Sequence, residues 1–280
     1  MHVKNVGILH PGAMGISVAA AAQRSGYTVI WCSAGRSSAT LQRVKEHKLV
    51  EMHSLEKLCQ TCEVLISVCP PHAAVNVANE VLASGFQGIF CDANAIAPDT
   101  VRRISGMMTT AGVAFVDGGI IGGPAWEPGG TCLYLSGERS ADIAELFSAG
   151  PLETTVIGAD PGKASALKMC YAAYTKGSTA LITTILSAAD DLDVWEELKT
   201  QWQQDFPQLA ETAEMRARRV TAKAWRFAGE MDEIAETFGS TGAPGEFHAG
   251  AAIVYRRLAR FKDTPELPDL EDVLRAVRGR

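Results

Sequence analysis

The sequence lacks the features of a membrane protein or a nucleic-acid-binding protein. No stretch of 18 uncharged apolar residues fits a membrane span, and the nearest one, Leu181–Ala189, is interrupted by Thr and Ser. The 26 basic and 32 acidic residues give a net charge of −6 and form no basic block. Strong attraction to a nucleic acid or an anionic membrane is therefore not expected. We expect a small-molecule substrate, with neither a nucleic-acid nor a membrane partner.

We expect neither a secretory leader nor a regular cysteine framework. The chain begins with a strand-like segment that His10 and Pro11 interrupt, unlike the apolar core of a signal peptide. The seven cysteines are an odd number and lie mostly in apolar runs, where a reduced thiol behaves as a small buried hydrophobe. Cys59 and Cys62 form a C-x-x-C pair without a second ligand pair, so no metal site is expected. These features predict a cytoplasmic protein.

Short β-rich runs alternate with helical segments up to about Gly158, which is typical of a parallel sheet covered by helices. After Gly162, long stretches rich in Ala, Leu, Glu, Lys and Arg predict helices only. We expect an α/β Rossmann-type domain with a mostly parallel sheet at residues 1–160 and an all-helical domain at 161–280. The expected strands are Val3–Leu9, Thr28–Cys32, Val64–Val68, Gly88–Asp92, Ala114–Asp117, Thr131–Ser136 and Thr154–Ile157, and the expected helices are Ala13–Ser25, Pro71–Ala83, Pro98–Ala111 and Ser140–Ser148.

The first helix of the second domain, roughly Lys163–Ala189, is nearly apolar all round. Such a helix is expected to be buried on most sides. Its length and apolar character favour packing in the core of a homodimer.

A glycine-containing turn follows the first expected strand and opens a helix. In a dinucleotide site the second glycine of G-x-G-x-x-G lets backbone amides approach the pyrophosphate, and the third lets the helix pack on the strand. Gly12 and Gly15 hold those two places, whereas His10 replaces the first glycine. We expect the whole turn to bind a dinucleotide cofactor: His10, Pro11, Gly12, Ala13, Met14 and Gly15.

The end of the second expected strand indicates which dinucleotide is preferred. An NAD enzyme usually carries an acidic residue here for the ribose 2′-hydroxyl, whereas a 2′-phosphate requires cations and hydroxyl donors. This chain has no acid but has Ser33, Arg36 and Ser37. We therefore predict NADP, the alternative being an exposed polar loop that binds no phosphate. After another strand, Cys69 and Pro70 are expected to border the cofactor with their backbone.

Four stretches of the sequence resemble the β-hydroxyacid dehydrogenase and 6-phosphogluconate dehydrogenase superfamily, in a branch with a short helical C-terminal domain. The resemblance covers about two thirds of the chain and implies an oxidoreductase. It supports a cofactor role for Asn94 at a strand end. The four stretches are Gly12–Gly15, Asp92–Ala95, Asp117–Gly123 with Gly130 and Thr131 beyond, and Gly162–Lys168.

The lysine that closes the fourth stretch is the general acid/base in that superfamily, so the resemblance assigns this role to Lys168. Lys168 lies in the apolar run Ala164–Ala173. Burial lowers the pKa of a lysine toward neutrality, where proton exchange with a carbonyl or an alcohol is efficient. The alternative interpretation is a solvated lysine.

Two departures from the superfamily pattern concern the residues around the substrate. The asparagines expected three and four residues after the lysine are Tyr171 and Ala172. A helix places Tyr171 one turn beyond Lys168 on the same face, where its hydroxyl could orient substrate or assist proton transfer. An ordinary buried tyrosine is the alternative.

The second departure is at the double glycine. The serine that would precede it and hold a substrate carboxylate is Ile121, although the amides of Gly122 and Gly123 could still bind an oxyanion. A substrate less acidic, bulkier or more apolar than a simple 3-hydroxy acid is expected. The tract Pro124–Pro128 is a candidate lid over this pocket.

The preferred interpretation is an NADP-dependent oxidoreductase that transfers a hydride between nicotinamide and an alcohol or carbonyl, with Lys168 moving the proton. One alternative is an imine reductase, which the altered carboxylate clamp and Tyr171 favour and Lys168 disfavours. Another is an NADP-binding sensor that has lost catalysis. Loss of catalysis would explain why the glycine, the asparagines and the serine of the superfamily pattern are missing.

Overall fold

The computed structural model describes residues 3–280, which form two compact units. One unit extends to Met169 and the other runs from Cys170 to Arg280. Helix α7 (Lys163–Asp191) contributes its first residues to the first unit and the remainder to the second. The expected division into residues 1–160 and 161–280 stays a prediction, because compactness alone does not say which residues bind cofactor and which bind substrate.

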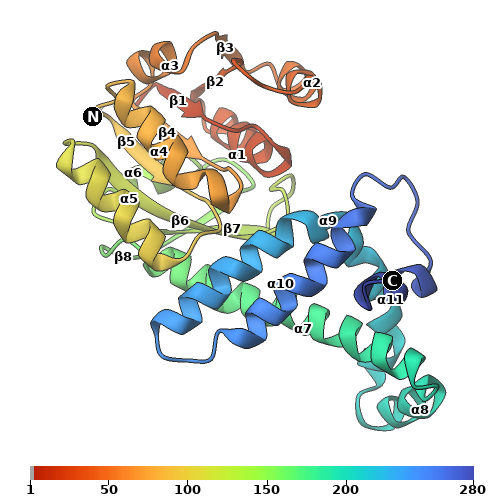
Figure 1. Ribbon diagram of the computed structural model, residues 1–280. Coiled ribbons are helices and arrows are strands. Elements are labelled where there is room, and N and C mark those ends of the chain that lie inside the picture. Colours follow the sequence, from red (N-terminus) through yellow and green to blue (C-terminus); the bar gives the residue numbers. More distant parts are fainter. Residues whose placement is uncertain (1–2) are drawn as a thin grey trace. The chain divides into compact units, whose positions relative to one another are not determined.

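An eight-stranded sheet forms the centre of the first unit in the described part of the chain (Figure 1). Its order is β3-β2-β1-β4-β5-β6-β7-β8, and every neighbouring pair is parallel except β6 with β7. The expected Rossmann-type, mostly parallel α/β sheet is confirmed. The strands are β1 (Asn5–Ile8), β2 (Thr28–Cys32), β3 (Val50–Met52), β4 (Val64–Ser67), β5 (Ile89–Asp92), β6 (Ala114–Gly122), β7 (Thr131–Ser136) and β8 (Glu153–Gly158).

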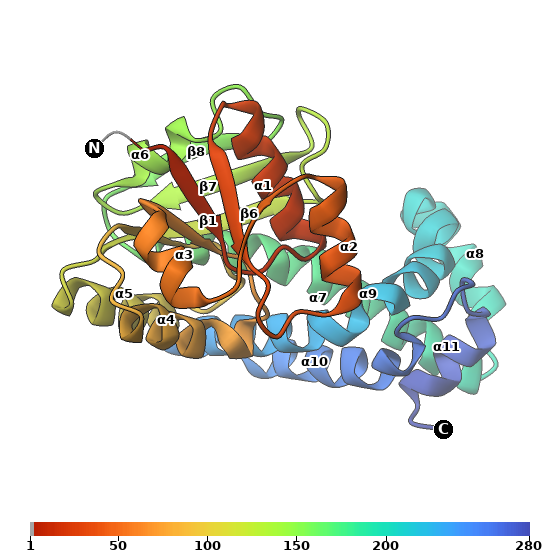
Figure 2. The same cartoon turned by 90° about the horizontal axis from the view of Figure 1, so that it is seen from above.

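Helices cover both faces of this sheet, because successive strand residues point to opposite sides. On one face, Val6 and Ile8 of β1 pack with α1 and α6. On the other, Leu65 and Phe90 pack with α3, α4 and α5, and α4 lies beside α5 (Figure 2). The helices of this unit are α1 (Ala13–Arg24), α2 (Ser38–Glu46), α3 (Leu55–Thr61), η1 (Pro71–Ala73), α4 (Ala74–Ala83), α5 (Pro98–Thr110) and α6 (Ser140–Glu145).

The observed elements differ from the expected ones mainly between β2 and β4 and at β6. Strand β3 has only three residues and α2 buries only Val44, so neither carries the apolar periodicity that marks a longer element. Strand β6 continues past the expected end at Asp117 to Gly122, because the glycines pair in an antiparallel ladder with β7. The stretch Asp117–Gly123, which contains both double glycines, is therefore largely strand.

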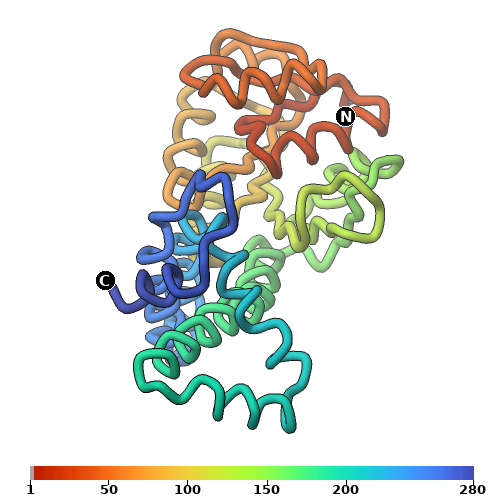
Figure 3. Tube along the Cα trace, turned by 90° about the vertical axis from the view of Figure 1, so that its right-hand side faces the viewer, coloured from red at the N-terminus to blue at the C-terminus, as the bar shows by residue number. Residues whose placement is uncertain are grey.

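The second unit is entirely helical, as expected after Gly162. Helices α9 and α10 lie side by side in it (Figure 3). A largely buried ion pair joins Lys176 to Glu230, and the hydroxyl of Tyr255 donates to the Lys176 carbonyl at 2.7 Å. No helix in residues 3–280 is long and apolar enough to cross a membrane. After α7, the elements are α8 (Trp195–Asp205), α9 (Pro207–Ser240), α10 (Glu246–Leu258), η2 (Ala259–Phe261) and α11 (Leu270–Val277).

Helix α7 is less buried in this single chain than its composition predicts. Tyr174 is 78% exposed, Tyr171 51% and Leu181 45%, and these residues recur at helical spacing along one face. The expected burial on most sides is therefore wrong for the single chain. An apolar face of α7 remains exposed in the second unit.

Candidate functional site

The predicted cofactor residues gather at one edge of the sheet. Strands β1, β2, β4 and β5 are mutually parallel, so their carboxyl ends lie at the same edge. The turn after β1 carries Gly12, the loop after β2 carries Arg36, the loop after β4 carries Cys69, and Asn94 follows β5. Residues from four separate segments are thus brought to a single edge.

The two glycines of the turn after β1 have different surroundings. A Cβ atom at Gly15 would lie 2.2 Å from the carbonyl oxygen of His10, so only glycine lets α1 pack this closely on the turn. A Cβ at Gly12 would meet nothing within 4 Å. Gly12 is the N-cap of α1 and no side chain caps that helix end. Open space beside uncapped amide donors fits a pyrophosphate group.

His10 and Arg36 lie close together at this turn. Burial first, and the nearby Arg36 charge second, lower the pKa of His10 from 6.5 to about 4, so the imidazole is neutral near pH 7. Within residues 3–280, His10 Nδ1 and Arg36 Nε are buried nitrogens without a hydrogen-bond partner. An acceptor-rich ligand would provide such partners.

The loop after β2 ends in a helix N-terminus that supplies hydroxyl groups. Ser37 is the N-cap of α2, and its Oγ accepts from the Thr40 amide at 3.3 Å and lies 3.2 Å from Thr40 Oγ1. The Ser33 hydroxyl lies 3.4 Å from the Met52 carbonyl and from His53 Nδ1, and its backbone amide donates to the same carbonyl. Positive helix-end potential, hydroxyls and the Arg36 guanidinium together fit an anionic group.

Asn94 joins the ends of β4 and β5. Its Oδ1 accepts from the Cys69 amide at 2.5 Å and its Nδ2 donates to Ser67 Oγ at 3.1 Å. Both polar ends of the buried amide are thereby engaged, so Asn94 shapes the loop that carries Cys69 and Pro70. Burial raises the pKa of the Cys69 thiol to about 12, which makes it an inert thiol at neutral pH.

A row of buried polar side chains crosses four strands at this edge. Ser67 of β4, Asp92 of β5, Asp117 of β6 and Ser136 of β7 are direct neighbours in the strand register, and each is at most 1% exposed. Asp92 lies two residues after Phe90, so it points to the face covered by α3 to α5. The register places the other three side chains on that same face.

Asp117 fixes the beginning of α7 above this row. Its Oδ2 accepts from the amides of Gly162 and Ser165 at 2.8 and 3.1 Å, and from the Ser136 hydroxyl at 2.9 Å. Its Oδ1 accepts from Ser165 Oγ at 2.6 Å. In turn, Ser136 Oγ accepts from the Ala164 amide at 3.1 Å. A buried carboxylate at a helix N-terminus both satisfies free amides and complements the helix dipole.

Lys168 lies in the second turn of the helix that Asp117 anchors. Its position relative to β6 is set by Gly119, where a Cβ would stand 2.6 Å from the Ala164 carbonyl oxygen and 3.3 Å from Lys168 Cβ. Helix and strand therefore touch without an intervening side chain. Lys168 is half-buried, and its charge lies near enough to Asp92 to lower the pKa of that carboxyl. The lysine is thus held close to the polar row.

The predicted substrate segment lies at the end of β6. Ile121 is half-buried, whereas Gly122 and Gly123 are exposed. At Gly122 the backbone has φ of 123°, and a Cβ there would lie 2.3 Å from the Gly130 carbonyl oxygen, so only glycine is accommodated. Thr131 Oγ1 donates to the Gly123 carbonyl at 2.6 Å. The segment is therefore a defined turn at the end of the β6–β7 ladder.

The tract proposed as a lid is attached to helices of the first unit. The Ala125 amide donates to Ser17 Oγ of α1 at 3.0 Å, and Ala125 is 1% exposed. Trp126 stacks on His47, which follows α2, with ring centroids 5.1 Å apart. The tract thus extends from the predicted substrate segment to helix α1 and to the end of α2.

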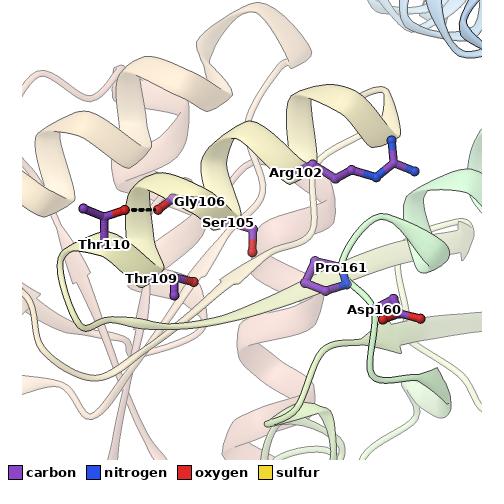
Figure 4. Close-up of a pocket in the computed structure, with 7 residues that line it drawn as sticks. All are labelled: Arg102, Ser105, Gly106, Thr109, Thr110, Asp160 and Pro161. Carbon is purple, nitrogen blue, oxygen red and sulfur yellow. Dashed lines mark hydrogen bonds between the residues drawn. The ribbon is translucent and has the colours of Figure 1, made fainter.

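Other features lie outside this site. A surface hollow of about 620 Å³ runs along α5, where Arg102, Ser105 and Thr109 face the segment Asp160–Pro161 (Figure 4). All its lining residues belong to α5 or to that segment, so it is separate from the sheet edge. Tyr171 belongs to the second unit and is 51% exposed in the single chain, so it is not a buried core tyrosine of that chain. No group of metal-ligating side chains occurs in residues 3–280.

Sequence reasoning assigned no role to the buried carboxylates of this site. In the sequence, Asp92 and Asp117 stand out only as parts of family-like stretches, whereas in the fold they form the centre of the polar row and Asp117 anchors α7. One signal was available: both are the last residues expected in neighbouring strands. An acid at two such strand ends indicates a shared polar edge.

Comparison with families of known proteins adds to this geometry. Residues 5–149 match the family described as the NAD-binding domain of 6-phosphogluconate dehydrogenase. Residues 189–258 match a domain of unknown function, DUF1932. An uncharacterized 28.5 kDa protein of Methanothermus fervidus is 30% identical over 168 residues. That match covers 60% of this chain and 64% of the relative, which is less than two thirds of its length.

Solved structures share the fold over nearly the whole chain. A conserved protein described as structurally similar to 3-hydroxyacid dehydrogenases is 27% identical, with a TM-score of 0.68 and coverage of 91% and 97% of the two chains. Mycobacterium tuberculosis 3-hydroxyisobutyrate dehydrogenase, solved with L-serine, is 17% identical, with a TM-score of 0.72 and 99% coverage of both. An imine reductase from Myxococcus stipitatus, solved with NAD⁺, is 14% identical, with a TM-score of 0.60 and 99% coverage of both.

Proposed function

The chain belongs to the family of the NAD-binding domain of 6-phosphogluconate dehydrogenase, and we propose that it is an NADP-preferring oxidoreductase acting between an alcohol and a carbonyl. The nicotinamide cofactor supplies or accepts the hydride. Lys168 is the general acid/base: its ammonium protonates the carbonyl oxygen in reduction, and its amine takes the hydroxyl proton in oxidation. The resemblance seen in the sequence is confirmed at the level of this family.

The observation that carries the proposal is the position of Lys168 over Gly119 of strand β6. Gly119 brings the backbone of α7 directly onto β6, and Asp117 fixes the first turn of that helix by three hydrogen bonds to Gly162 and Ser165. The amine is thereby carried on a rigid element beside the same sheet edge as the Gly12 turn. A proton-transfer group requires such fixed placement to act.

Three features of the edge support binding of the dinucleotide, and two of them support the preference for NADP. The open space at Gly12 and the uncapped start of α1 fit the pyrophosphate, with His10, Pro11, Ala13, Met14 and Gly15 completing the turn. Arg36 and the hydroxyls of Ser33 and Ser37 fit a 2′-phosphate. No acidic side chain is placed in this loop to bind a 2′-hydroxyl. Cys69, Pro70 and Asn94 complete the cofactor site.

The substrate is proposed to bind at Ile121, Gly122 and Gly123. Exposed backbone at the two glycines offers amides to an oxyanion, while Ile121 adds an apolar surface in place of a hydroxyl. This combination favours a carbonyl compound with an apolar portion. Tyr171, with its exposed ring, is proposed as an additional substrate-orienting group.

The same features support imine reduction as the second candidate. A C=N substrate needs no carboxylate clamp, and the replaced serine and asparagine are the residues such a clamp would use. A panel of cyclic imines, ketones and hydroxy acids, with NADPH consumption as the readout, separates the two reactions. Faster turnover of imines than of every ketone would replace the alcohol–carbonyl assignment.

A homodimer and a cytoplasmic location belong to the proposal as well. The exposed apolar side chains on α7 support an interface with a second copy of the chain. All seven cysteines are free thiols, which accords with a reducing compartment.

Substitution of Lys168 by Ala is the direct test. NADPH binding, measured by fluorescence titration, should be retained, while turnover should fall by about 10²- to 10⁴-fold, the usual contribution of a general acid/base. Lys163→Ala, on the exposed side of the first turn of α7, is the matched control and should retain turnover. Retention of most activity by the Lys168 variant would refute its role. Binding of NADPH without turnover of any substrate by the natural chain would instead support the sensor alternative.

A further inference from the structure

Asp92 is the one member of the polar row whose side chain is only half engaged. Its Oδ1 accepts from the Asn94 amide at 2.9 Å, whereas its Oδ2 is buried without a hydrogen-bond partner within residues 3–280. The residue is 1% exposed. A buried carboxyl oxygen without a hydrogen-bond partner lowers the stability of the fold, so its presence calls for a functional explanation.

The strand register places this carboxyl beside the helix that carries Lys168. Asp92 pairs with Asp117 of β6, and the two side chains point to the same face of the sheet. Two residues further along β6 on that face is Gly119, whose missing side chain lets Lys168 Cβ approach the strand. The lysine therefore stands over β6, the strand that pairs with β5 at Asp92.

We propose that Asp92 is a positioning residue for Lys168, holding the amine in its protonated, proton-donating form at the buried edge of the sheet. This inference rests on the proposed function of Lys168 for its catalytic meaning. Burial of an amine favours its neutral form, and a neighbouring carboxylate opposes that effect. Without Asp92 the lysine would lose its proton at lower pH and cease to be an acid.

The charges around Asp92 are consistent with such a pair. Burial, the dominant cause, and the nearby Asp117 raise the pKa of Asp92 to about 7, while the Asn94 hydrogen bonds and Lys168 lower it. Of the other titratable groups nearby, Cys69 follows β4, and Cys91 precedes Asp92 on β5 and points to the opposite face of the sheet. Burial raises the pKa of both thiols, so both are neutral. Lys168 is thus the cation whose charge acts on Asp92.

The test is a titration of each partner in the absence of substrate and cofactor. The Lys168 amine can be followed by NMR after isotopic labelling, with the Lys168→Met variant assigning its signal. In Asp92→Asn, which keeps the shape of the side chain, the midpoint of the Lys168 titration should fall by about one pH unit, the lower end of the effect of a close opposite charge. Asp99→Asn, which removes an exposed carboxylate on α5, should leave the midpoint unchanged.

The reverse measurement uses the Asp92 carboxyl signal in Lys168→Met. Because the coupling between two sites is reciprocal, the Asp92 midpoint should rise by the same amount by which the Lys168 midpoint falls. This variant changes only a half-buried side chain, so it remains informative if Asp92→Asn does not fold. Unchanged midpoints in either folded variant would overturn the proposal.

The kinetic consequence is separable from the proposed function. In carbonyl reduction, the loss of rate at high pH should move to lower pH in Asp92→Asn by the shift seen in the titration, whereas a structural defect would lower the rate at every pH. If Lys168→Ala retained turnover while the midpoints still moved, the proposed function would fail and the Asp92–Lys168 coupling would stand. If Lys168→Ala were inactive and the midpoints did not move, the proposed function would stand and the Asp92–Lys168 coupling would fail.

Discussion

The carboxylate of Asp117 accepts a hydrogen bond from the backbone amide of Gly162 at 2.8 Å, joining two residues 45 positions apart in the chain. This bond attaches the start of helix α7 to strand β6. The attachment thereby sets the position of Lys168, which lies in the second turn of α7. The geometry of the candidate site therefore depends on a residue that touches neither the predicted cofactor turn nor the predicted substrate segment.

Replacement of Asp117 by Ala should destabilise the first unit. The change leaves the amides of Gly162 and Ser165 and the Ser165 hydroxyl without their acceptor in a buried place. We expect a loss of about 3 kcal/mol in the free energy of unfolding, since each unsatisfied buried donor costs of the order of 1 kcal/mol or more. Urea denaturation measures it. Asp99→Ala, at an exposed position, should change stability by less than about 0.5 kcal/mol and serves as the control.

Substitution by Ala should have different effects at the two glycines of the proposed cofactor turn: Gly15→Ala should mainly lower stability, and Gly12→Ala should mainly weaken NADPH binding. Gly15→Ala forces a methyl group against the His10 carbonyl and should cost about 2 kcal/mol of stability, as overpacking does. Gly12→Ala adds a methyl group to open space and should cost less than about 1 kcal/mol. It should nevertheless weaken NADPH binding by about 10-fold or more, equivalent to about 1.4 kcal/mol. Thermal melting and NADPH titration distinguish the two effects, and equal affinities for the Gly12 variant and the natural chain would contradict the placement of the pyrophosphate.

Arg36→Ala should weaken NADPH binding selectively. Loss of a charge-assisted hydrogen bond to the 2′-phosphate is worth about 1.5 to 3 kcal/mol, or about 10- to 100-fold in affinity. NADH lacks that phosphate, so its affinity should change little. Arg24→Ala, an exposed change at the end of α1, controls for the loss of one positive charge. A parallel loss of NADH and NADPH affinity in the Arg36 variant would show that the guanidinium does not read the phosphate.

The pH dependence of stability should differ in sign between two single variants. His10 has its pKa lowered from 6.5 to about 4 by folding, so the unfolded chain binds more protons between those values. Its contribution to stability is present above pH 6.5 and is lost as the pH falls toward 4, by about 3 kcal/mol at most. Asp92 has its pKa raised from 3.8 to about 7, so its contribution is present below pH 3.8 and is lost as the pH rises toward 7.

These two contributions oppose each other in the natural chain between about pH 4 and pH 6.5. A variant that removes one titrating group leaves the contribution of the other unopposed. As the pH rises through this window, the free energy of unfolding of His10→Gln should fall relative to that of the natural chain, and that of Asp92→Asn should rise. The measurement is the free energy of unfolding in urea at pH 4.5 and 6.5 for all three proteins, each variant compared with the natural chain. Parallel pH profiles for the three proteins would show that neither group titrates as the structure indicates.

Tyr174→Glu should disrupt the proposed homodimer. Tyr174 is 78% exposed in the single chain, so the substitution leaves the fold of one copy undisturbed while placing a charge in an apolar interface. Sedimentation velocity should then show a monomer in place of a dimer. Leu41→Glu, at another exposed apolar position, on α2 of the first unit, should leave the assembly unchanged. A dimer that survives in the Tyr174 variant would exclude this face of α7.

The expected and observed structures agree where local pattern is strong. The β1 strand with the turn to α1 was predictable because apolar runs, glycine positions and a helix start coincide within 20 residues. The three-residue strand β3 was not, since its edge position leaves Val50 exposed and removes the apolar signal. Likewise, the glycines of β6 lie beyond the expected end of the strand at Asp117, because the ladder that makes them a strand depends on β7, a separate segment of the chain.

The sequence by itself determined that a parallel α/β sheet with a dinucleotide turn precedes a helical region, because periodicity and glycine spacing act over short distances. Only the tertiary structure decided that Asp92 and Asp117, from two different strands, lie side by side beneath the helix of Lys168. Strand order and register bring distant segments together, and no local pattern encodes which strand becomes the neighbour of another. The electrostatic environment of the lysine is for that reason a property of the folded sheet.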